Sequence, residues 1–240
     1  MGTRGRCQLS PAFAQNAIGR ATRPDWEGRR SRCLYCCYKT VPTLSFTEMS
    51  YSTVQPPFSL NLRDMPKSEL KRYFQWFMDV LPGRVHELAR AVKATPGFER
   101  WGPDYTAASL DALGHWFAGQ VETRKRTKDE LEETKNRQAF PMEVPNEELT
   151  NRTFSLAMDL GMYLSQVLIK NHPSLKWEQP IGDKRFVDYG QPSLVGFGRV
   201  TLNPVGVAVT FAYGLVSKTK TGKGLREVYD YWSRRVQPAS

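Results

Sequence analysis

The sequence predicts an α+β protein in which helices pack around one central apolar helix and a small antiparallel sheet lies in the C-terminal half. Two observations predict this fold class. Apolar residues recur at helical spacing through most of residues 66–170, and a pattern typical of strands begins only after Pro173, before a last helical stretch. A chain that runs from helices to strands and back to a helix belongs to the α+β class rather than the alternating α/β class.

The first 48 residues differ from the rest of the chain in charge and in cysteine content. They hold 8 Lys and Arg against 3 Asp and Glu, and they contain all four cysteines. Prolines and glycines interrupt their few apolar residues, so residues 1–48 are predicted to be a disordered basic extension. Residues 49–240 are predicted to form a single α+β domain, which no disulfide stabilises because it contains no cysteine.

Three explanations of residues 1–48 stay open: a basic arm for nucleic acid, a targeting peptide, or a stretch that is not translated. The change of composition near Met49 favours a translation start there. A secretory signal is not expected, because no apolar stretch follows the first arginines. A mitochondrial-type presequence fits the arginines and the lack of acidic residues in residues 1–24, but prolines and glycines spoil its amphipathic helix.

No stretch of the chain suggests a membrane partner. The most apolar run, residues 205–216, is well short of the roughly 20 residues that cross a bilayer. We therefore expect a cytoplasmic protein.

Two amphipathic helices are predicted in the first half of the domain. Apolar residues recur every three or four positions over residues 66–92, where Pro82 predicts a kink or two consecutive helices. A second helix, capped by Thr106, carries apolar side chains as far as Val121. The charged run that follows, residues 122–133, is predicted to be a solvated helix or a solvated segment that extends away from the domain.

The central helix is predicted to begin within residues 146–151 and to continue to about Lys170. Apolar residues cover nearly every side of it, as expected of a helix packed at the centre of a domain. Within it, Asp159 needs a cation or hydrogen-bond donors to offset its desolvation. We expect Asp159 either to bond a tyrosine, an arginine or a backbone group, or to share a cleft with Asp188 or Glu178.

Beyond the central helix the pattern becomes that of strands. Residues 175–178 and residues 185–189 are predicted to form a hairpin with a turn at residues 180–184, and residues 194–197 a third strand. The sheet is predicted to be small and antiparallel.

The last part of the chain is predicted to be mostly helical. Asn203 and Pro204 are typical of a helix start, which we favour although the valines after them alternate as in a strand. A polar basic loop, residues 214–224, then precedes a last amphipathic helix over residues 225–236.

No complete catalytic, cofactor or metal motif is present, so no catalytic residue, cofactor or metal ligand is predicted. Gly222-Lys223 lacks the other positions of a phosphate loop, and residues 196–198 supply only the start of a dinucleotide fingerprint. The three histidines stand far apart, and Cys33 and Cys36 lack the second pair of ligands that zinc needs. A thiol enzyme is excluded in the main domain, which has no cysteine.

Part of the C-terminal half carries a resemblance to known domains. It comprises residues 159–168, Trp177, the predicted hairpin, residues 190–192 and Asn203-Pro204. These short motifs resemble a broad set of uncharacterised bacterial α+β domains, some of which look like immunity proteins of toxin systems. The resemblance implies a small intracellular α+β binding protein and carries over no catalytic residue.

Three functions remain as hypotheses. The first is a non-enzymatic protein that binds another protein through the sheet face and neighbouring charged loops, as an immunity-type inhibitor binds a toxin. The second is a hydrolase that uses Asp159 with carboxylates of the hairpin. The third is a nucleic-acid-binding protein that uses basic residues near the C-terminus. The residues expected to contribute to binding are Asp159, Tyr163, Trp177, Asp188, Tyr189, Lys218, Lys220 and Lys223.

Overall fold

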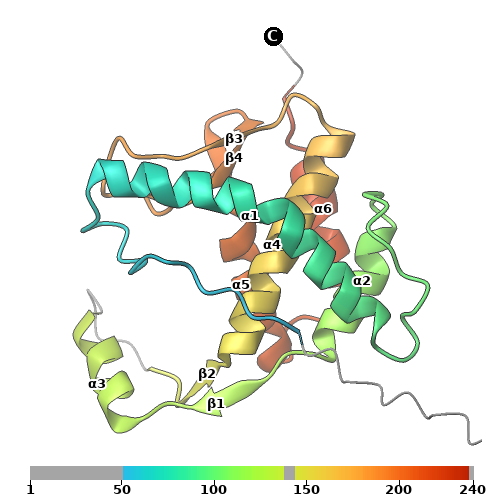
Figure 1. The fold of residues 1–240 in the computed structure, drawn as a ribbon, viewed down its shortest axis with the longest axis horizontal. Helices are drawn as coiled ribbons and strands as arrows, with labels where there is room; N and C mark the ends of the chain where they lie inside the picture. The colour runs from blue at the N-terminus through green and yellow to red at the C-terminus, as the bar shows by residue number, and fades with distance from the viewer. Residues whose placement is uncertain (1–50, 138–143, 238–240) are drawn as a thin grey trace, which may run out of the picture. The chain divides into compact units, whose positions relative to one another are not determined.

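Six helices and five short strands form the part of the chain that the computed structural model describes, residues 51–137 and 144–237 (Figure 1). The helices are α1 (Lys67–Lys93), α2 (Ser109–Ala118), α3 (Lys128–Arg137), α4 (Asn151–Asn171), α5 (Pro204–Val216) and α6 (Gly224–Ser233). The strands are β1 (Thr123–Lys125), β2 (Glu147–Leu149), β3 (Lys176–Glu178), β4 (Ser193–Phe197) and β5 (Val200–Leu202). The predicted α+β class is confirmed. The predictions for residues 1–48 lie outside the described residues.

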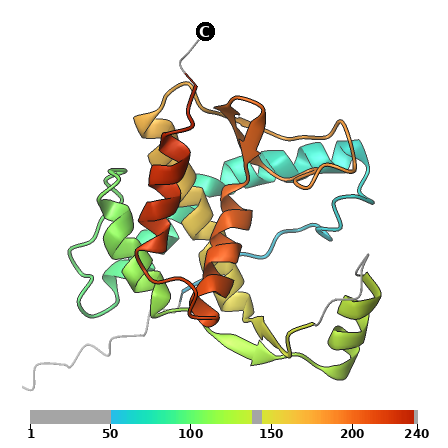
Figure 2. The same ribbon diagram turned by 180° about the vertical axis from the view of Figure 1, so that it is seen from behind.

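The predicted central helix is α4. Its first turn is capped by Thr150, whose side-chain oxygen accepts a hydrogen bond from the Thr153 N–H at 3.2 Å. Buried side chains surround it along most of its length, and α1 lies on one side of it while α5 lies on the other (Figures 1 and 2). Apolar residues on nearly every side of this helix in the sequence therefore indicate that other helices pack on opposite faces of it.

The crossing of α4 and α5 is close because one residue has no side chain. A Cβ atom on Gly161 of α4 would lie 2.7 Å from the Pro204 carbonyl oxygen and 2.8 Å from the Val205 Cα. The start of α5 is fixed by Asn203, whose side chain accepts a hydrogen bond from the Gly206 N–H at 2.9 Å. The preference for a helix after Asn203 is thus confirmed.

α1 is one helix that continues through Pro82, so the alternative of two consecutive helices is wrong. Proline removes one backbone hydrogen bond from a helix interior, but the buried face of α1 continues on both sides of it, from Leu81 to Val85. The charged run after α2 forms β1 and the exposed helix α3. β1 then pairs with β2 in a two-stranded antiparallel sheet.

The prediction that residues 175–178 and 185–189 pair as a hairpin is wrong. β3 pairs with β4, and residues 185–189 form turns in which the Tyr189 N–H donates to the Phe186 carbonyl at 3.1 Å. Their apolar residues do not share one sheet face: Val187 is 80% exposed, whereas Tyr189 is buried. Tyr189 belongs to a small second core whose other members are Leu62, Met65, Leu70 and Tyr73.

The glycine at the helix crossing gives a test of this packing. Gly161→Ala is expected to destabilise the chain by about 1–3 kcal/mol, because the new methyl group meets the backbone of α5, which cannot move aside as a side chain would. Gly83→Ala in α1 is the matched control: its Cβ meets nothing within 4 Å, so a gain of about 0.5–1 kcal/mol in helix propensity is expected. Urea unfolding of both variants measures the difference. Equal stability of the two variants would contradict the close crossing.

Candidate functional site

A buried ion pair joins the central helix to α1. Asp159 is fully buried on α4, and Arg84 of α1 donates to it twice, from Nε to Oδ1 and from Nη2 to Oδ2, each at 2.7 Å. The Arg84 side chain is 12% exposed. A guanidinium that meets both oxygens of a carboxylate fixes the orientation of both groups.

The N-terminal segment of the described chain is attached to this ion pair. Tyr51 donates its phenol proton to Asp159 Oδ2 at 2.5 Å and accepts a hydrogen bond from Arg84 Nη2 at 2.6 Å. Because that proton is committed to Asp159, the 2.9 Å bond to Ser155 takes its proton from the serine. The Val54 N–H in turn donates to the Ser155 oxygen at 2.7 Å. We call the four side chains of Tyr51, Arg84, Ser155 and Asp159 the latch.

The latch holds an extended stretch, residues 51–60, which we call the strap. It runs across α4 beside α1 (Figure 1). Two further bonds hold its outer edge: the Ser52 N–H donates to Glu87 Oε1 at 2.6 Å, and Arg84 Nη1 donates to the Ser52 carbonyl at 2.9 Å. The strap therefore has polar attachments to both α1 and α4.

Burial dominates the electrostatics of the latch. It raises the pKa of Asp159 to about 6, because the lost hydration of the carboxylate outweighs the lowering by Arg84 and by the Tyr51 phenol. Burial and the neighbouring Asp159 also raise the pKa of Tyr51, so the phenol remains a donor at neutral pH. The ion pair thus stabilises the fold less than its geometry alone suggests.

A pocket of about 490 Å³ lies beside the latch, between the strap and the helices. Its size falls in the range of binding pockets for small groups. Its lining within the described residues contains no charged side chain, which leaves an apolar wall with hydroxyl and amide groups. We call it the strap pocket, and it is lined by Thr53, Val54, Gln55, Pro56, Leu60, Tyr73, Asn151, Phe154, Ser155, Met158, Gln191, Val205 and Val209.

Leu60, at the rim of the strap pocket, has a strained backbone. Its φ is 56°, in the left-handed region where a bulky side chain crowds the following carbonyl, and the side chain is 46% exposed. Such a residue keeps nearly half of its surface in water and has a strained backbone. Strained backbone of this kind is concentrated at sites that bind a ligand or a partner.

The structure does not bring Asp159 together with the other predicted carboxylates. Asp188 Oδ1 accepts a hydrogen bond from Asn203 Nδ2 at 3.1 Å, and no interaction between Asp159 and either Asp188 or Glu178 is present among the described residues. The carboxylate whose charge acts on Asp159 is Glu87. The expectation that an arginine and a tyrosine bond Asp159 is confirmed.

The predicted aromatic residues contribute mainly to packing. Tyr163 is fully buried, and its phenol bonds the Ser109 hydroxyl at 2.7 Å and accepts from the Tyr105 N–H at 3.2 Å. Trp177 meets the ring of Phe77 edge to face at 5.3 Å. Tyr189 lies in the second core. The structure therefore does not gather these rings on one exposed surface.

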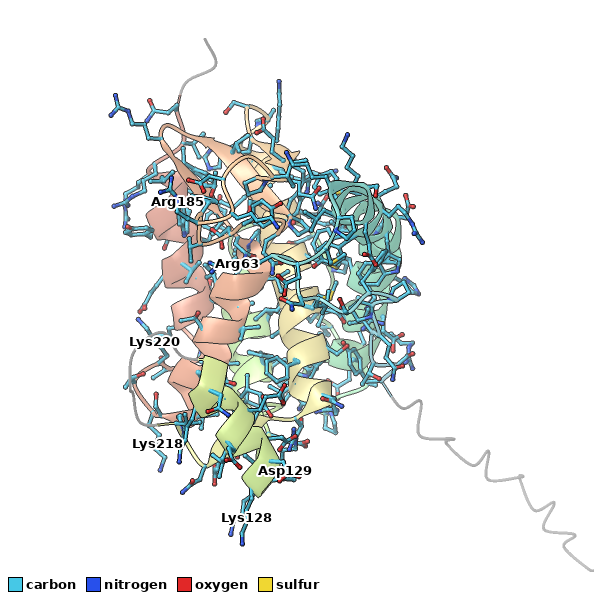
Figure 3. The ribbon with its side chains drawn as sticks, turned by 90° about the vertical axis from the view of Figure 1, so that its left-hand side faces the viewer. Arg63, Lys128, Asp129, Arg185, Lys218 and Lys220 are labelled. Atoms are coloured by element: carbon cyan, nitrogen blue, oxygen red, sulfur yellow. The ribbon has the colours of Figure 1, made fainter. Side chains whose placement is uncertain are left out.

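The predicted basic residues Lys218, Lys220 and Lys223 are all exposed, in the segment between α5 and α6. Lys220 lines a different pocket, beside Thr123 and Tyr213, and no carboxylate pairs with these three lysines within the described residues. Figure 3 shows Lys220 and Lys218 below Arg63 and Arg185 on the face of the molecule that is turned to the viewer. They are not part of the strap pocket.

Arg84, Tyr51 and Leu60 were not predicted as site residues from the sequence. A signal for Arg84 exists, since it lies three residues after Leu81 and four before Leu88, on the buried face of α1. A charge on an apolar helix face indicates a buried partner. Tyr51 and Leu60 have no comparable signal, because their roles depend on the path of an irregular segment.

Comparison with protein-family models, with curated proteins and with solved structures found no match. No helix in the described ranges combines the length and the apolar character that crossing a bilayer requires. The same residues contain no group of three His, Cys, Asp or Glu side chains placed to hold a metal ion.

The raised pKa of Asp159 predicts how stability changes with pH. The folded chain holds this proton up to about pH 6, whereas the unfolded chain releases it near the ordinary value of 3.8, so the stability due to the protonated group is lost as pH rises between these values. The Asp159→Asn variant cannot titrate there. We expect the unfolding free energy of the wild type, measured relative to this variant in urea, to fall by about 1–3 kcal/mol across that interval.

Arg84→Met provides the control for this pH series. It leaves the buried carboxylate without its cation, so at neutral pH it should destabilise the chain by about 3 kcal/mol, and adding Asp159→Asn should restore most of the loss. A wild-type stability that rises with pH relative to Asp159→Asn would contradict the account, since it would mean that Arg84 outweighs desolvation.

Proposed function

We propose that the chain is a non-enzymatic binding protein whose strap pocket receives an apolar, uncharged side chain of a partner protein. The observation that carries the proposal is Leu60, an exposed apolar residue in strained backbone at the rim of a pocket whose described lining has no charge. Burial against a partner would give this leucine the contacts that it lacks in the free chain.

The polar groups of the strap pocket suit a peptide. Gln55, Asn151 and Gln191 line it from three different segments, and each side-chain amide can both donate to a peptide carbonyl and accept from a peptide N–H. Tyr73 adds a phenol, whose pKa burial raises to about 12, so it too is uncharged at neutral pH. An inserted charge would have no counter-ion in this lining, which favours a neutral side chain.

The lining favours binding over catalysis. Within the described residues it offers no carboxylate, imidazole, amine or thiol that could transfer a proton or attack a substrate. The one hydroxyl next to an acid, that of Ser155, is committed to the latch. This supports protein binding over the hydrolase, but at the strap pocket and not, as expected from the sequence, at the sheet face and its charged loops.

We propose a toxin as the partner. The resemblance of the C-terminal half to immunity-type domains supports a toxin as the first partner to test, with the chain acting as its inhibitor. A complex of this kind would place an apolar residue of the toxin in the strap pocket.

A capped, uncharged peptide with a central leucine flanked by glutamines is the probe for the strap pocket. We expect it to shift the amide resonances of Leu60, Ser155 and Gln191 in NMR titrations of the full chain. Val209→Lys, which puts a charge into the pocket, should weaken binding by about 10-fold or more, since the ammonium has no partner there. Val216→Lys, on the same helix outside this pocket, is the matched control and should bind as the wild type does.

Two results would contradict the proposed function. One is the absence of shifts at the strap pocket, and the other is equal loss of binding in both lysine variants. Leu60→Gly separates binding from stability. It should stabilise the free chain by up to about 1 kcal/mol, because glycine relieves the backbone strain, and yet it should lower the affinity for the peptide.

A further inference from the structure

We propose that residues 51–57, the first part of the strap, act as a lid that opens at the latch, pivots at Phe58 and closes over the partner's side chain. This inference rests on the proposed function and describes how access to the strap pocket is controlled. In Figure 1 the lid, at the blue end of the colour range, crosses α4. It supplies residues 53–56 to the lining of the pocket, and most of the other lining residues stand on helices. Movement of the lid therefore changes the entrance of the pocket while its floor stays in place.

The backbone of the strap has no regular structure that would hold it in place. Among the described residues, no backbone–backbone hydrogen bond includes any of residues 51–60. Pro56 and Pro57 have no N–H, so the lid lacks two of the donors that pairing with a neighbouring strand would need. Within the described part of the chain, only the Ser52 and Val54 N–H groups of the lid are hydrogen-bonded, both to side chains. A segment held by so few bonds opens at a lower free-energy cost than a helix or a sheet does.

The two ends of the strap are held by different kinds of contact. At the N-terminal end the contacts are the hydrogen bonds of the latch. At the C-terminal end Phe58 packs edge to face against Tyr73 and Trp76 of α1, with ring centroids 5.7 and 6.1 Å apart, and Leu62 and Met65 beyond it are buried in the second core. Water can replace the hydrogen bonds of a phenol, whereas it cannot replace the packing of apolar rings. The polar end is therefore the end that opens, and Phe58 is the pivot.

Ser155 of α4 connects the lid to the pocket. Its oxygen accepts a hydrogen bond from the Val54 N–H at 2.7 Å, and the same side chain lines the pocket. Phe154 and Met158 of α4 and Val209 of α5 line it too. These side chains stand on helices, which open less readily than an irregular segment does. Opening of the lid therefore frees the Ser155 oxygen for a peptide N–H and gives access to an apolar floor that is already formed.

Closure of the lid adds contacts to a bound partner. Gln55 is exposed in the free chain and also lines the pocket, so its amide can bond a peptide when the lid lies over that peptide. Val54, which is half-buried against the main core, brings apolar surface to the same place. A partner held under the lid leaves only when the lid opens again. Opening of the lid therefore limits both association and dissociation.

The kinetics of binding distinguish a lid from a fixed wall. Weakening the latch of a fixed wall would speed only the dissociation of a partner, because the way into the pocket would be unchanged. Weakening the latch of a lid speeds its opening with and without a partner, so the association and dissociation rate constants rise together. The affinity then changes much less than either rate constant.

Tyr51→Phe tests the lid on the full chain, since it removes the hydroxyl that bonds Asp159 and Arg84. The probe is the capped, uncharged leucine peptide with a fluorescent label, and temperature-jump relaxation of its fluorescence measures both rate constants. We expect both to rise about 10-fold, the effect of losing one net hydrogen bond from the closed form.

Tyr231→Phe is the matched control, because it removes the same hydroxyl from an exposed tyrosine of α6 that does not line the pocket. It should leave both rate constants unchanged. A rise of the dissociation rate constant alone in Tyr51→Phe would overturn the lid in favour of a fixed wall, and it would leave the proposed function standing.

A second measurement, on the free chain, needs no peptide. NMR relaxation dispersion detects exchange on the μs–ms timescale, and we expect such exchange at the amides of Ser52 and Val54 but not at those of α4. The opening rate from these data should rise about 10-fold in Tyr51→Phe. No exchange at Ser52 and Val54 would overturn the inference. Failure of the peptide to bind would contradict the proposed function instead, and the dispersion data would still decide whether the lid opens.

Discussion

The latch is the constraint on which the rest of the site depends. Its ion pair and phenol join three segments: the strap, the middle of α1 and the central helix. Without these bonds the strap has few buried contacts of its own, because most of its residues are exposed or half-buried. Since the strap forms one wall of the pocket, a polar cluster in the interior determines the shape of an apolar site at the surface.

The latch adds less stability than its bonds suggest, and the strained backbone of Leu60 lowers stability, in the region that the proposed function uses. Desolvation of Asp159 offsets the attraction of Arg84, so the buried ion pair stabilises the fold less than its geometry suggests. Leu60 keeps a left-handed backbone that a glycine would adopt without strain. Locally unfavourable conformations and buried charges are expected at functional positions, because good packing in the rest of the structure compensates for their cost. Both features therefore point to the same region of the molecule.

The helices could be predicted from the sequence because each is specified locally. The apolar spacing, the cap at Thr150 and the Asn203-Pro204 start all act within a few residues, and α4 and α5 begin and end near the predicted positions. The sheet pairing could not be predicted, because β3 has three residues and an alternating pattern after residue 184 imitated its partner. Strands this short contain too few alternating positions to decide between two partners.

The chemistry around Asp159 could be predicted from the sequence, whereas the strap pocket could not, since none of its lining residues was among the predicted site residues. The apolar surroundings of Asp159 along the sequence correctly predict that donors such as arginine or tyrosine offset its desolvation. The identity of those donors depends on tertiary packing, since Arg84 lies 75 positions away and Tyr51 lies 108 positions away. The strained φ of Leu60 results from the route of the strap, which no periodic pattern describes.

Hydrogen exchange of the Val54 amide, compared between the wild type and Tyr51→Phe, measures the role of the latch most directly. Loss of the phenol should release the strap, so the Val54 and Ser52 amides should exchange about 10-fold faster while the amides of α4 keep their protection. Tyr231→Phe, at an exposed tyrosine of α6, is the control and should change neither. Unchanged exchange of Val54 in Tyr51→Phe would contradict the claim that the latch holds the wall of the pocket.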